Sequence, residues 1–290
     1  MTPELPPLDA IDAVIDRALA EDLGADGDVT SAATVAAGAV GRAEATTRQA
    51  GVVAGLPVAA RVFRRVGAGR LTVNQTAEDG EAVVPGAVVL SVAGPVRDIL
   101  TAERTALNLL GHLSGVATFT RRWVDAVAGT GAVIRDTRKT LPGLRALEKY
   151  AVRCGGGVNH RMSLSDAALV KDNHVLAAGG AAHAFELVRL AWPGLPIEVE
   201  VDTLAQAREV VAAGADLVLL DNMSIADMRM AVEFAKARGT RTEASGGLTL
   251  DRARAVAETG VDYLAVGALT HSAPVLDIGL DLVMEGTDVR

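Results

Sequence analysis

One local pattern recurs from residue 132 onward and constrains the fold more than any other feature of the chain. A short apolar segment ends in a polar residue and is followed by an amphipathic helical segment. The apolar segments cover residues 132–137, 168–174, 197–202, 217–222, 242–247 and 263–268. Apolar strands that alternate with helices predict a parallel sheet covered on both faces, here a β/α barrel with fewer than eight strands. A doubly wound open sheet is the alternative, although no GxGxxG motif follows the first strand.

The first part of the chain has a different pattern. Residues 8–22 carry apolar side chains at helical spacing. Between residues 46 and 99, short β-branched runs separated by Glu-Asp-Gly and Pro-Gly turns predict a small sheet. Residues 98–127, rich in Leu, Ala and Thr, predict a long helix that links the two regions. We therefore expect a scaffold domain followed by the barrel.

Composition and charge exclude several classes of protein. The 290 residues are 50% hydrophobic but only 3% aromatic, and their formal net charge is −8. Such a chain is not expected to bind nucleic acid. The longest uncharged run, Thr105 to Thr120, is too short to span a bilayer. The acidic, proline-rich start lacks the basic region of a secretory signal. We expect a soluble, cytoplasmic protein in which the only cysteine, Cys154, is a small buried side chain.

In a β/α barrel the active site lies at the C-terminal ends of the strands. The predicted strands bring a series of polar residues to these ends. In chain order they are Asp136 to Thr140, His160-Arg161, Lys171 to His174, the period-two set Glu198, Glu200 and Asp202, then Asp221-Asn222, Glu243, Ser245, Gly246, Gly247 and Gly267.

The charge of this region opposes that of the whole chain, because residues 135–171 hold eight basic and three acidic residues. Four side chains at helical spacing, Arg145, Glu148, Lys149 and Arg153, are predicted to form a solvated helix face. The other cations, Arg138, Lys139, Arg161 and Lys171, would lie in the barrel mouth, where a charge needs an anionic partner. The sequence therefore predicts a site for a multiply charged anion.

Two glycine turns close the last strands. Backbone N–H groups at such turns bind phosphate, and barrels often place a phosphate site after their final strands. The turns contain Ser245-Gly246-Gly247, which we expect to open a helix, and Gly267, with His271 four residues further on. Glu200 and Asp221 face this region and would bind ribose hydroxyls or Mg²⁺, or serve as counterions for Lys139 and Lys171.

Together these residues resemble a known family, quinolinate phosphoribosyltransferase, also called carboxylating nicotinate-nucleotide pyrophosphorylase. The resemblance runs almost end to end, and its most specific part is the long block at residues 135–174. It is carried by EDLGADGDVTS (21–31), TAERTALNLLGHLSGVAT (101–118), RDTRKTLPGLRALEKYAVRCGGGVNHRMSLSDAALVKDNH (135–174), EVEVD (198–202), LVLLDNM (217–223), EASGGL (243–248) and YLAVGALTHSAP (263–274).

The resemblance implies a fold, a reaction and an assembly. Residues 1–108 would form an N-terminal α/β sandwich domain, residues 109–271 an incomplete, seven-stranded β/α barrel, and residues 272–290 a tail that packs back on the first domain. The implied reaction converts quinolinate and phosphoribosyl pyrophosphate, with Mg²⁺, to nicotinate mononucleotide, pyrophosphate and CO₂ in de novo NAD biosynthesis. The implied unit is a homodimer with shared active sites, with higher assembly possible and without nucleic-acid or membrane partners.

The resemblance also implies roles for individual residues. Quinolinate would be held by Arg104 of the partner subunit together with Arg138, His160, Arg161 and Lys171. Lys139 would approach the pyrophosphate or the reacting centre, and Glu200 and Asp221 would bind ribose hydroxyls and Mg²⁺; with Lys171 these three form the implied catalytic set. The 5′-phosphate would be held by Ser245, Gly246, Gly247, Gly267 and His271.

Three other functions remain open from the residues alone. They are a nicotinate-specific phosphoribosyltransferase, another phosphate-handling barrel enzyme such as a phosphoribosyl isomerase, and a non-catalytic relative that binds a phosphate-bearing metabolite. The number of cations favours a substrate with two carboxylates over nicotinate, which has one.

Overall fold

The computed structural model describes residues 3–284, which fall into two compact units. The first comprises the described residues up to Arg121, Thr140–Gly156 and those from Leu269 onward, and the second comprises Arg122–Lys139 and Gly157–Ala268. The expected boundary between residues 108 and 109 falls inside one long helix, α4 (Val96–Ala126), and the domain limits stay predictions. No helix among the described residues is long and apolar enough to cross a membrane.

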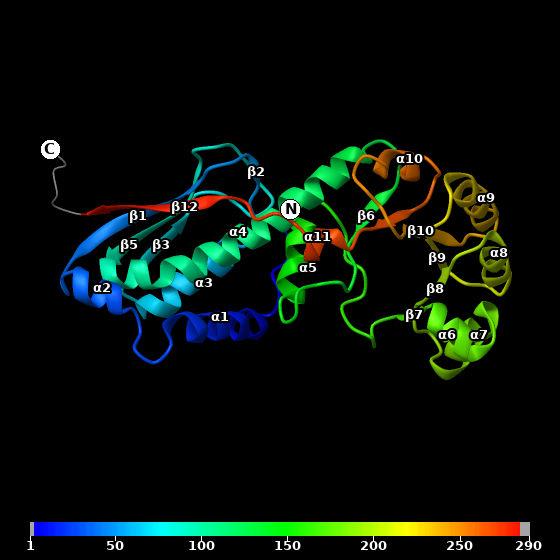
Figure 1. Ribbon diagram of the computed structural model, residues 1–290, viewed down its shortest axis with the longest axis horizontal. Helices are drawn as coiled ribbons and strands as arrows, with labels where there is room; N and C mark the ends of the chain where they lie inside the picture. The colour runs from blue at the N-terminus through cyan, green and yellow to red at the C-terminus, as the bar shows by residue number, and fades with distance from the viewer. Residues whose placement is uncertain (1–2, 285–290) are drawn as a thin grey trace. The chain divides into compact units, whose positions relative to one another are not determined.

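The first unit contains a four-stranded sheet of order β12-β1-β5-β3 and a two-stranded sheet, β2-β4, both antiparallel (Figure 1). Helix α3 packs against β3 and β5. The elements that lie wholly or mainly in this unit are α1 (Leu8–Leu23), α2 (Val29–Thr34), β1 (Val40–Thr47), β2 (Gly51–Val52), α3 (Leu56–Gly67), β3 (Thr72–Gln75), β4 (Ala82–Val83), β5 (Val88–Pro95), α4, α5 (Arg145–Cys154), α11 (Ala268–His271) and β12 (Ile278–Met284). The helices predicted at residues 8–22 and 98–127 are confirmed as α1 and α4.

Strand β1 was not expected from the sequence. It lacks a β-branched run, but its burial alternates along the chain, with Ala43, Ala45 and Thr47 buried. It forms the centre of the sheet, between β5 and β12, with Ala45 opposite Leu280 of β12. The sequence signal of this strand is therefore a row of small buried residues at alternate positions rather than a run of Val and Ile.

The predicted solvated face of helix α5 is wrong for two of its four residues. Glu148 and Lys149 are buried. The Glu148 carboxylate accepts hydrogen bonds from His112 Nε2, 2.9 Å away, and from the backbone N–H of Leu141. The carboxylate of Glu148 is thus satisfied inside the unit, and its spacing along the helix alone does not predict this. The expectation for Cys154 is confirmed, since it is a free, buried residue and burial raises the pKa of its thiol to about 12.

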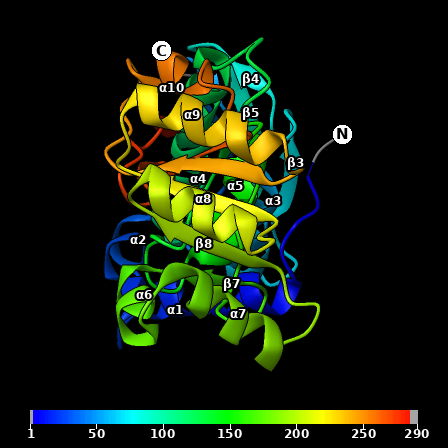
Figure 2. The same ribbon diagram turned by 90° about the vertical axis from the view of Figure 1, so that its right-hand side faces the viewer.

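The second unit contains the predicted six-stranded parallel sheet, of order β6-β11-β10-β9-β8-β7. Its elements are β6 (Val133–Arg135), β7 (Ala168–Val170), α6 (Asp172–Ala178), α7 (Ala181–Ala191), β8 (Ile197–Val201), α8 (Leu204–Ala212), β9 (Leu217–Asp221), α9 (Ile225–Lys236), β10 (Arg241–Ser245), α10 (Ala253–Ala257) and β11 (Tyr263–Ala265). Figure 2 shows the helices beside their strands in chain order, from α7 through α8 and α9 to α10.

Six strands rather than seven make up this sheet in the described residues. Beyond β6, Val158 forms a single parallel bridge with Arg135 and does not extend into a strand. The seven-stranded detail of the expected barrel is therefore not established.

Local signals explain where the helices of this unit begin. Thr203 caps α8 in a reciprocal arrangement with Gln206, and the Ser224 side chain accepts the backbone N–H of Asp227 at the start of α9. Because all six strands are parallel, their C-terminal ends meet at one edge of the sheet. The register places Asp221 beside Ser245 and Glu200 beside Leu219 at that edge.

Candidate active site

The C-terminal edge of the parallel sheet surrounds a cavity of about 660 Å³, here called the main cavity. All of its lining residues belong to the second unit. Ten of the residues predicted from the sequence line it: Arg138, Lys139, His160, Arg161, Lys171, Glu200, Asp221, Ser245, Gly246 and Gly247. As predicted from the positions of the strand ends, these ten residues, which lie between positions 138 and 247 of the sequence, come together at one cavity.

Two guanidinium groups in the main cavity are only partly satisfied by the described residues. The Nε atoms of Arg138 and Arg161 are buried and have no hydrogen-bond partner among the described residues. Arg161 donates from Nη1 to the carbonyl of Ala167, 2.6 Å away. Burial, and then the nearby charge of Arg138, lowers the pKa of Arg161. Two like charges held close together in a cavity favour a ligand that carries negative charge on at least two groups.

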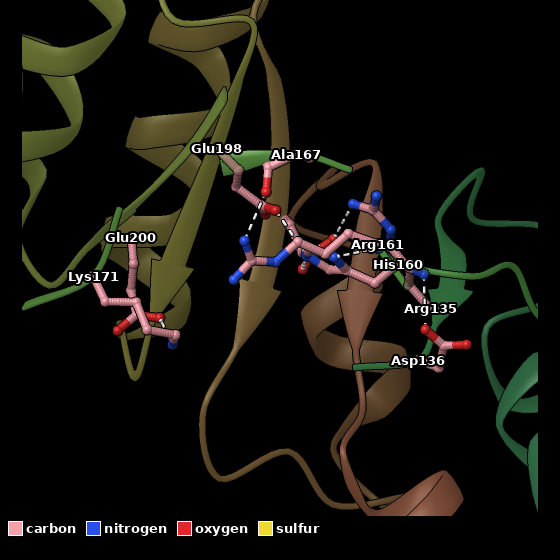
Figure 3. Close-up of polar contacts among 9 residues, drawn as sticks. Arg135, Asp136, His160, Arg161, Ala167, Lys171, Glu198 and Glu200 are labelled. Carbon is pink, nitrogen blue, oxygen red and sulfur yellow. Dashed lines mark hydrogen bonds and ion pairs between the residues drawn. The ribbon is translucent and has the colours of Figure 1, made fainter. Parts of the chain in front are cut away.

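Lys171 lies between strand β7 and helix α6, where the sequence predicted a longer strand. Its Nζ is 2.5 Å from Glu200 Oε2, and the Lys171 side chain remains 46% exposed. Figure 3 shows this pair apart from the arginine and histidine side chains. Glu200 is thus the counterion of Lys171 in this structure, one of the two roles left open by the sequence.

His160 borders the main cavity, but the protein already occupies both of its ring nitrogens. The backbone N–H of Arg161 donates to Nδ1 at 2.7 Å, so the ring proton lies on Nε2, which donates to Glu198 Oε2 at 2.8 Å. The carboxylate of Asp136, itself buried, accepts the backbone N–H of His160 at 2.7 Å. These contacts, drawn in Figure 3, orient the His160-Arg161 segment beside the cavity.

Four residues form a charged cluster, here called the buried ionic layer: His160, Glu198 and Glu243 are buried, and the side chain of Arg135 is 17% exposed. Arg135 Nη1 donates to Glu243 Oε2 at 2.7 Å, and the second Glu243 oxygen lies 3.7 Å from His160 Nε2. Burial raises the pKa of Glu198 to about 7. Burial, and then the charge of Glu198, raises the pKa of Glu243 to about 7 as well. Oε1 of each glutamate is buried without a donor, which a proton held by one of the two carboxyls would relieve.

The turn after β10 holds Gly246 and Gly247 at positive φ angles of 83° and 54°. It does not open a helix, contrary to prediction, because α10 begins only at Ala253. Asp221 lies at the end of the neighbouring strand, and its Oδ2 accepts a hydrogen bond from Asn222 Nδ2 at 2.6 Å. The phosphate-binding hypothesis for this turn therefore depends on loop amides rather than on a helix N-terminus.

Three predicted residues do not line the main cavity. Gly267 lies between β11 and α11 in the second unit. Arg104 is an exposed residue of α4, and His271 is an exposed residue whose Nδ1 is 2.6 Å from Ser272 Oγ. Arg104 and His271 both belong to the first unit, and their binding roles stay predictions.

Comparison with known proteins identifies the family. Residues 28–114 match the quinolinate phosphoribosyl transferase N-terminal domain, and residues 116–281 match the C-terminal domain. The chain belongs to the quinolinate phosphoribosyl transferase family. A carboxylating nicotinate-nucleotide pyrophosphorylase from Mycobacterium leprae is 53% identical over 277 residues, which cover 94% of this chain and 98% of that protein.

Solved structures agree with this assignment. The crystal structure of NadC from Streptococcus pyogenes matches with a TM-score of 0.92 and 40% identity, over 97% of this chain and 99% of that chain. Human nicotinic acid phosphoribosyltransferase matches with a TM-score of 0.62 at 15% identity, over 98% of this chain and 75% of that one, which shows a shared fold alone.

In this member of the family, the sequence alone predicted no role for Arg135, Glu198 or Glu243. Their signal was present, since each is a charged residue inside an apolar strand. Alternation on β8 placed Glu198 on the face of Glu200, but it does not tell which of two residues on one face is buried. Asp202, the third member of that set, lies just beyond the end of β8 and is exposed.

Two groups of side chains offer ligand atoms for a divalent cation. One ligand atom from each of His160, Glu198 and Glu243 lies within 4.8 Å of the others, but Arg135 already neutralises Glu243. Glu200 and Asp221 are on neighbouring strand ends and both line the main cavity. Carboxylate oxygens beside open space fit Mg²⁺, which binds few protein ligands and keeps room for substrate oxygens.

Proposed function

We infer that this chain transfers a phosphoribosyl group from phosphoribosyl pyrophosphate to quinolinate, with release of pyrophosphate and CO₂ and formation of nicotinate mononucleotide. The observation that carries the inference is the pair of arginines in the main cavity, Arg138 and Arg161, whose buried Nε atoms lack partners. The family membership and the similarity to carboxylating nicotinate-nucleotide pyrophosphorylases support the same reaction. The reaction would contribute to de novo NAD biosynthesis.

In this proposal quinolinate binds at the cationic side of the main cavity. Arg138, Arg161 and Lys171 hold its two carboxylates, and Lys171 exchanges Glu200 for the substrate. His160 supports this subsite chiefly through its hydrogen bond from the Arg161 backbone, because both of its ring nitrogens have protein partners. Planar guanidinium groups suit bidentate binding of carboxylates.

Phosphoribosyl pyrophosphate binds at the opposite side of the cavity. Glu200 and Asp221 bind its ribose hydroxyls and Mg²⁺, while Lys139 approaches the pyrophosphate. The 5′-phosphate is held by Ser245, Gly246, Gly247, Gly267 and His271. When bound, Mg²⁺ supplies positive charge that stabilises the leaving pyrophosphate.

Catalysis in this arrangement is positioning and electrostatic stabilisation. The quinolinate nitrogen attacks the anomeric carbon of the ribose as the bond to pyrophosphate breaks. The carboxylates of Glu200 and Asp221 stabilise the positive charge that develops on the ribose. The pyridine nitrogen then carries a positive charge. When CO₂ leaves, the electron pair of the broken C–C bond stays on the adjacent ring carbon, where the positive nitrogen stabilises it, and a proton then binds to that carbon in place of the carboxyl group.

We also propose a homodimer in which Arg104 of one subunit reaches the quinolinate site of the other. The position of the exposed Arg104 supports this role, because Glu103-Arg104 begins the long, mainly apolar stretch of α4. Equal mixtures of Arg104→Ala and Lys171→Ala subunits, each inactive alone, should recover part of the activity. No recovery after demonstrated subunit exchange would refute the shared site.

We also propose that the parallel sheet is an incomplete barrel of seven strands. We take the segment at Val158 as the position of the seventh barrel strand, supported by its parallel bridge with Arg135. The open side of the barrel would then lie between this segment and β7.

The decisive assay uses quinolinate labelled in the carboxyl group next to the ring nitrogen, with phosphoribosyl pyrophosphate and Mg²⁺. Release of labelled CO₂ together with nicotinate mononucleotide is the expected result. Turnover of nicotinate instead would favour a nicotinate-specific enzyme, and quinolinate binding without turnover would favour a non-catalytic relative. Either result would overturn the proposal.

A further inference from the structure

Asn222 has a left-handed backbone conformation, which is uncommon outside glycine although asparagine adopts it more readily than most residues. Among the described residues only Ala68 and Asn222 have positive φ angles without being glycine, at 46° and 53°. Ala68 ends helix α3, where left-handed residues are common. Asn222 instead follows strand β9 directly and lines the main cavity. Strained non-glycine residues of this kind cluster at functional sites because the surrounding contacts hold them in place.

The contacts of Asn222 join the ends of two strands. Its backbone N–H donates to the carbonyl of Ser245 at 3.0 Å, at the end of β10. Its side-chain Nδ2 donates to Asp221 Oδ2 at 2.6 Å. Among residues 3–284 no donor is paired with the other oxygen of that carboxylate, Oδ1. The amide thus fixes one oxygen of Asp221 and leaves the second for a ligand.

The same side chain lies against the glycine turn. A Cβ atom added to Gly246 would lie 2.4 Å from both Cγ and Oδ1 of Asn222 and 2.6 Å from its Nδ2. Glycine is therefore required at position 246 for two reasons, its positive φ angle and the space that the Asn222 amide occupies. The turn and the carboxylate are held in register by one side chain.

We propose that Asn222 is a positioning residue that sets the Asp221 carboxylate and the Ser245–Gly247 turn at a fixed spacing for the phosphoribosyl donor. The inference rests on the proposed function, in which Asp221 and this turn bind that substrate. In this proposal Asn222 does not need to touch the substrate itself, because its effect is carried by Asp221 and Gly246. Quinolinate binding, which depends on Arg138 and Arg161, should not depend on Asn222.

The test is Asn222→Gly, which keeps the left-handed backbone accessible and removes only the side chain. Residues that orient ligand groups typically change affinity or activity by about 10- to 100-fold when removed. Titration calorimetry should show weaker binding of phosphoribosyl pyrophosphate with Mg²⁺. The affinity for quinolinate should stay within about twofold of the wild-type value, a smaller change than the loss of an orienting residue causes. In turnover assays, the Mg²⁺ concentration for half-maximal rate should rise. Ala68→Gly, the same change at the other left-handed residue, should alter none of these quantities.

A double-mutant cycle tests the contact with the turn. Gly246→Ala should impair donor binding strongly in the wild-type background and less in the Asn222→Gly background, where the added methyl group has room. Asn222→Asp provides a second variant of the same shape, which removes the amide donor and places a second negative charge beside Asp221. It should weaken donor binding at least as much as Asn222→Gly.

Three outcomes would overturn the inference. Unchanged donor binding in both Asn222 variants would do so, as would additive effects in the double-mutant cycle. Equal losses of donor and quinolinate affinity with a lower melting temperature would show a merely structural role. A wild-type protein that fails to convert quinolinate would instead refute the proposed function, so the two failures are distinguishable.

Discussion

Strand β8 contributes one glutamate to each of two charged regions that differ in burial. Glu198 belongs to the buried ionic layer, where its carboxylate accepts His160 Nε2–H and lies near Glu243. Two residues further on, Glu200 borders the main cavity and pairs with Lys171, whose side chain is almost half exposed. The strand period of two places both glutamates on one face, and depth along the strand separates them.

The two regions differ in what their charges are free to do. In the buried layer each charge compensates another, because an isolated charge there would be very costly. At the main cavity, Lys171 and Glu200 can exchange each other for water or substrate at little cost. One sheet thus carries charged side chains that stabilise the fold and charged side chains that can bind ligands. Solvent accessibility distinguishes the two kinds better than residue type does.

The largest predicted effect follows from breaking the buried layer. Arg135→Ala leaves Glu243 without its cation and should lower the free energy of unfolding by about 3–5 kcal/mol. Urea denaturation measures this change. Arg241→Ala is the matched control, because Arg241 also lies over the ring of Tyr263 but is exposed. Equal, small losses in both variants would contradict the distinction drawn between the two regions.

The next effect concerns ligand binding rather than folding. Arg138→Ala should weaken quinolinate binding by about 2–5 kcal/mol, since it leaves a substrate carboxylate without its partner. Its free energy of unfolding should change little, because Arg138 forms no ion pair within the described residues and its removal relieves repulsion with Arg161. Calorimetric titration with quinolinate provides the measurement, and Arg208→Ala on α8 is a control arginine outside the main cavity. Near-normal affinity would remove Arg138 from the site.

The sequence was informative where one physical signal decides the structure. Apolar strands alternating with helices predicted all six strands of the parallel sheet. The expected position of the active site at the strand ends predicted that ten residues between positions 138 and 247 would line one cavity. These signals are local in the chain, and parallel pairing then brings the ends together without further information.

What could not be predicted depends on contacts between distant residues. The burial of Glu148 requires His112, 36 positions earlier, and the buried layer joins Arg135 to Glu243, 108 positions later. The position of Asn222 against Gly246 depends on backbone angles that composition does not encode. Charged residues in apolar strands do signal that such partners exist, but not which residues they are.

The pH dependence of stability should report the buried layer. Because burial raises the pKa of Glu243 from its ordinary 4.5 to about 7, the folded protein binds more protons than the unfolded chain between these values. The free energy of unfolding should therefore fall as pH rises from 4.5 to about 7, with a slope approaching 1.4 kcal/mol per pH unit for each such proton. Glu243→Gln should flatten this slope in urea denaturation at several pH values, and the exposed control Glu258→Gln should not. An unchanged slope in Glu243→Gln would place the titration elsewhere.

The smallest effect is expected from the pair at the main cavity. Lys171→Met removes the ion pair with Glu200, whose side chain is 13% exposed. It should nevertheless change the free energy of unfolding by less than about 1 kcal/mol, because the Lys171 end of the pair is 46% exposed and ion pairs that water can reach contribute little. The substitution also removes a positive charge from the cationic cavity, which opposes the loss of the pair. The difference from wild type should shrink further in 1 M NaCl, where the screening length is only about 3 Å. A loss as large as that of Arg135→Ala, insensitive to salt, would mean that Lys171 and Glu200 serve the fold as the buried layer does, and that accessibility does not separate the two regions.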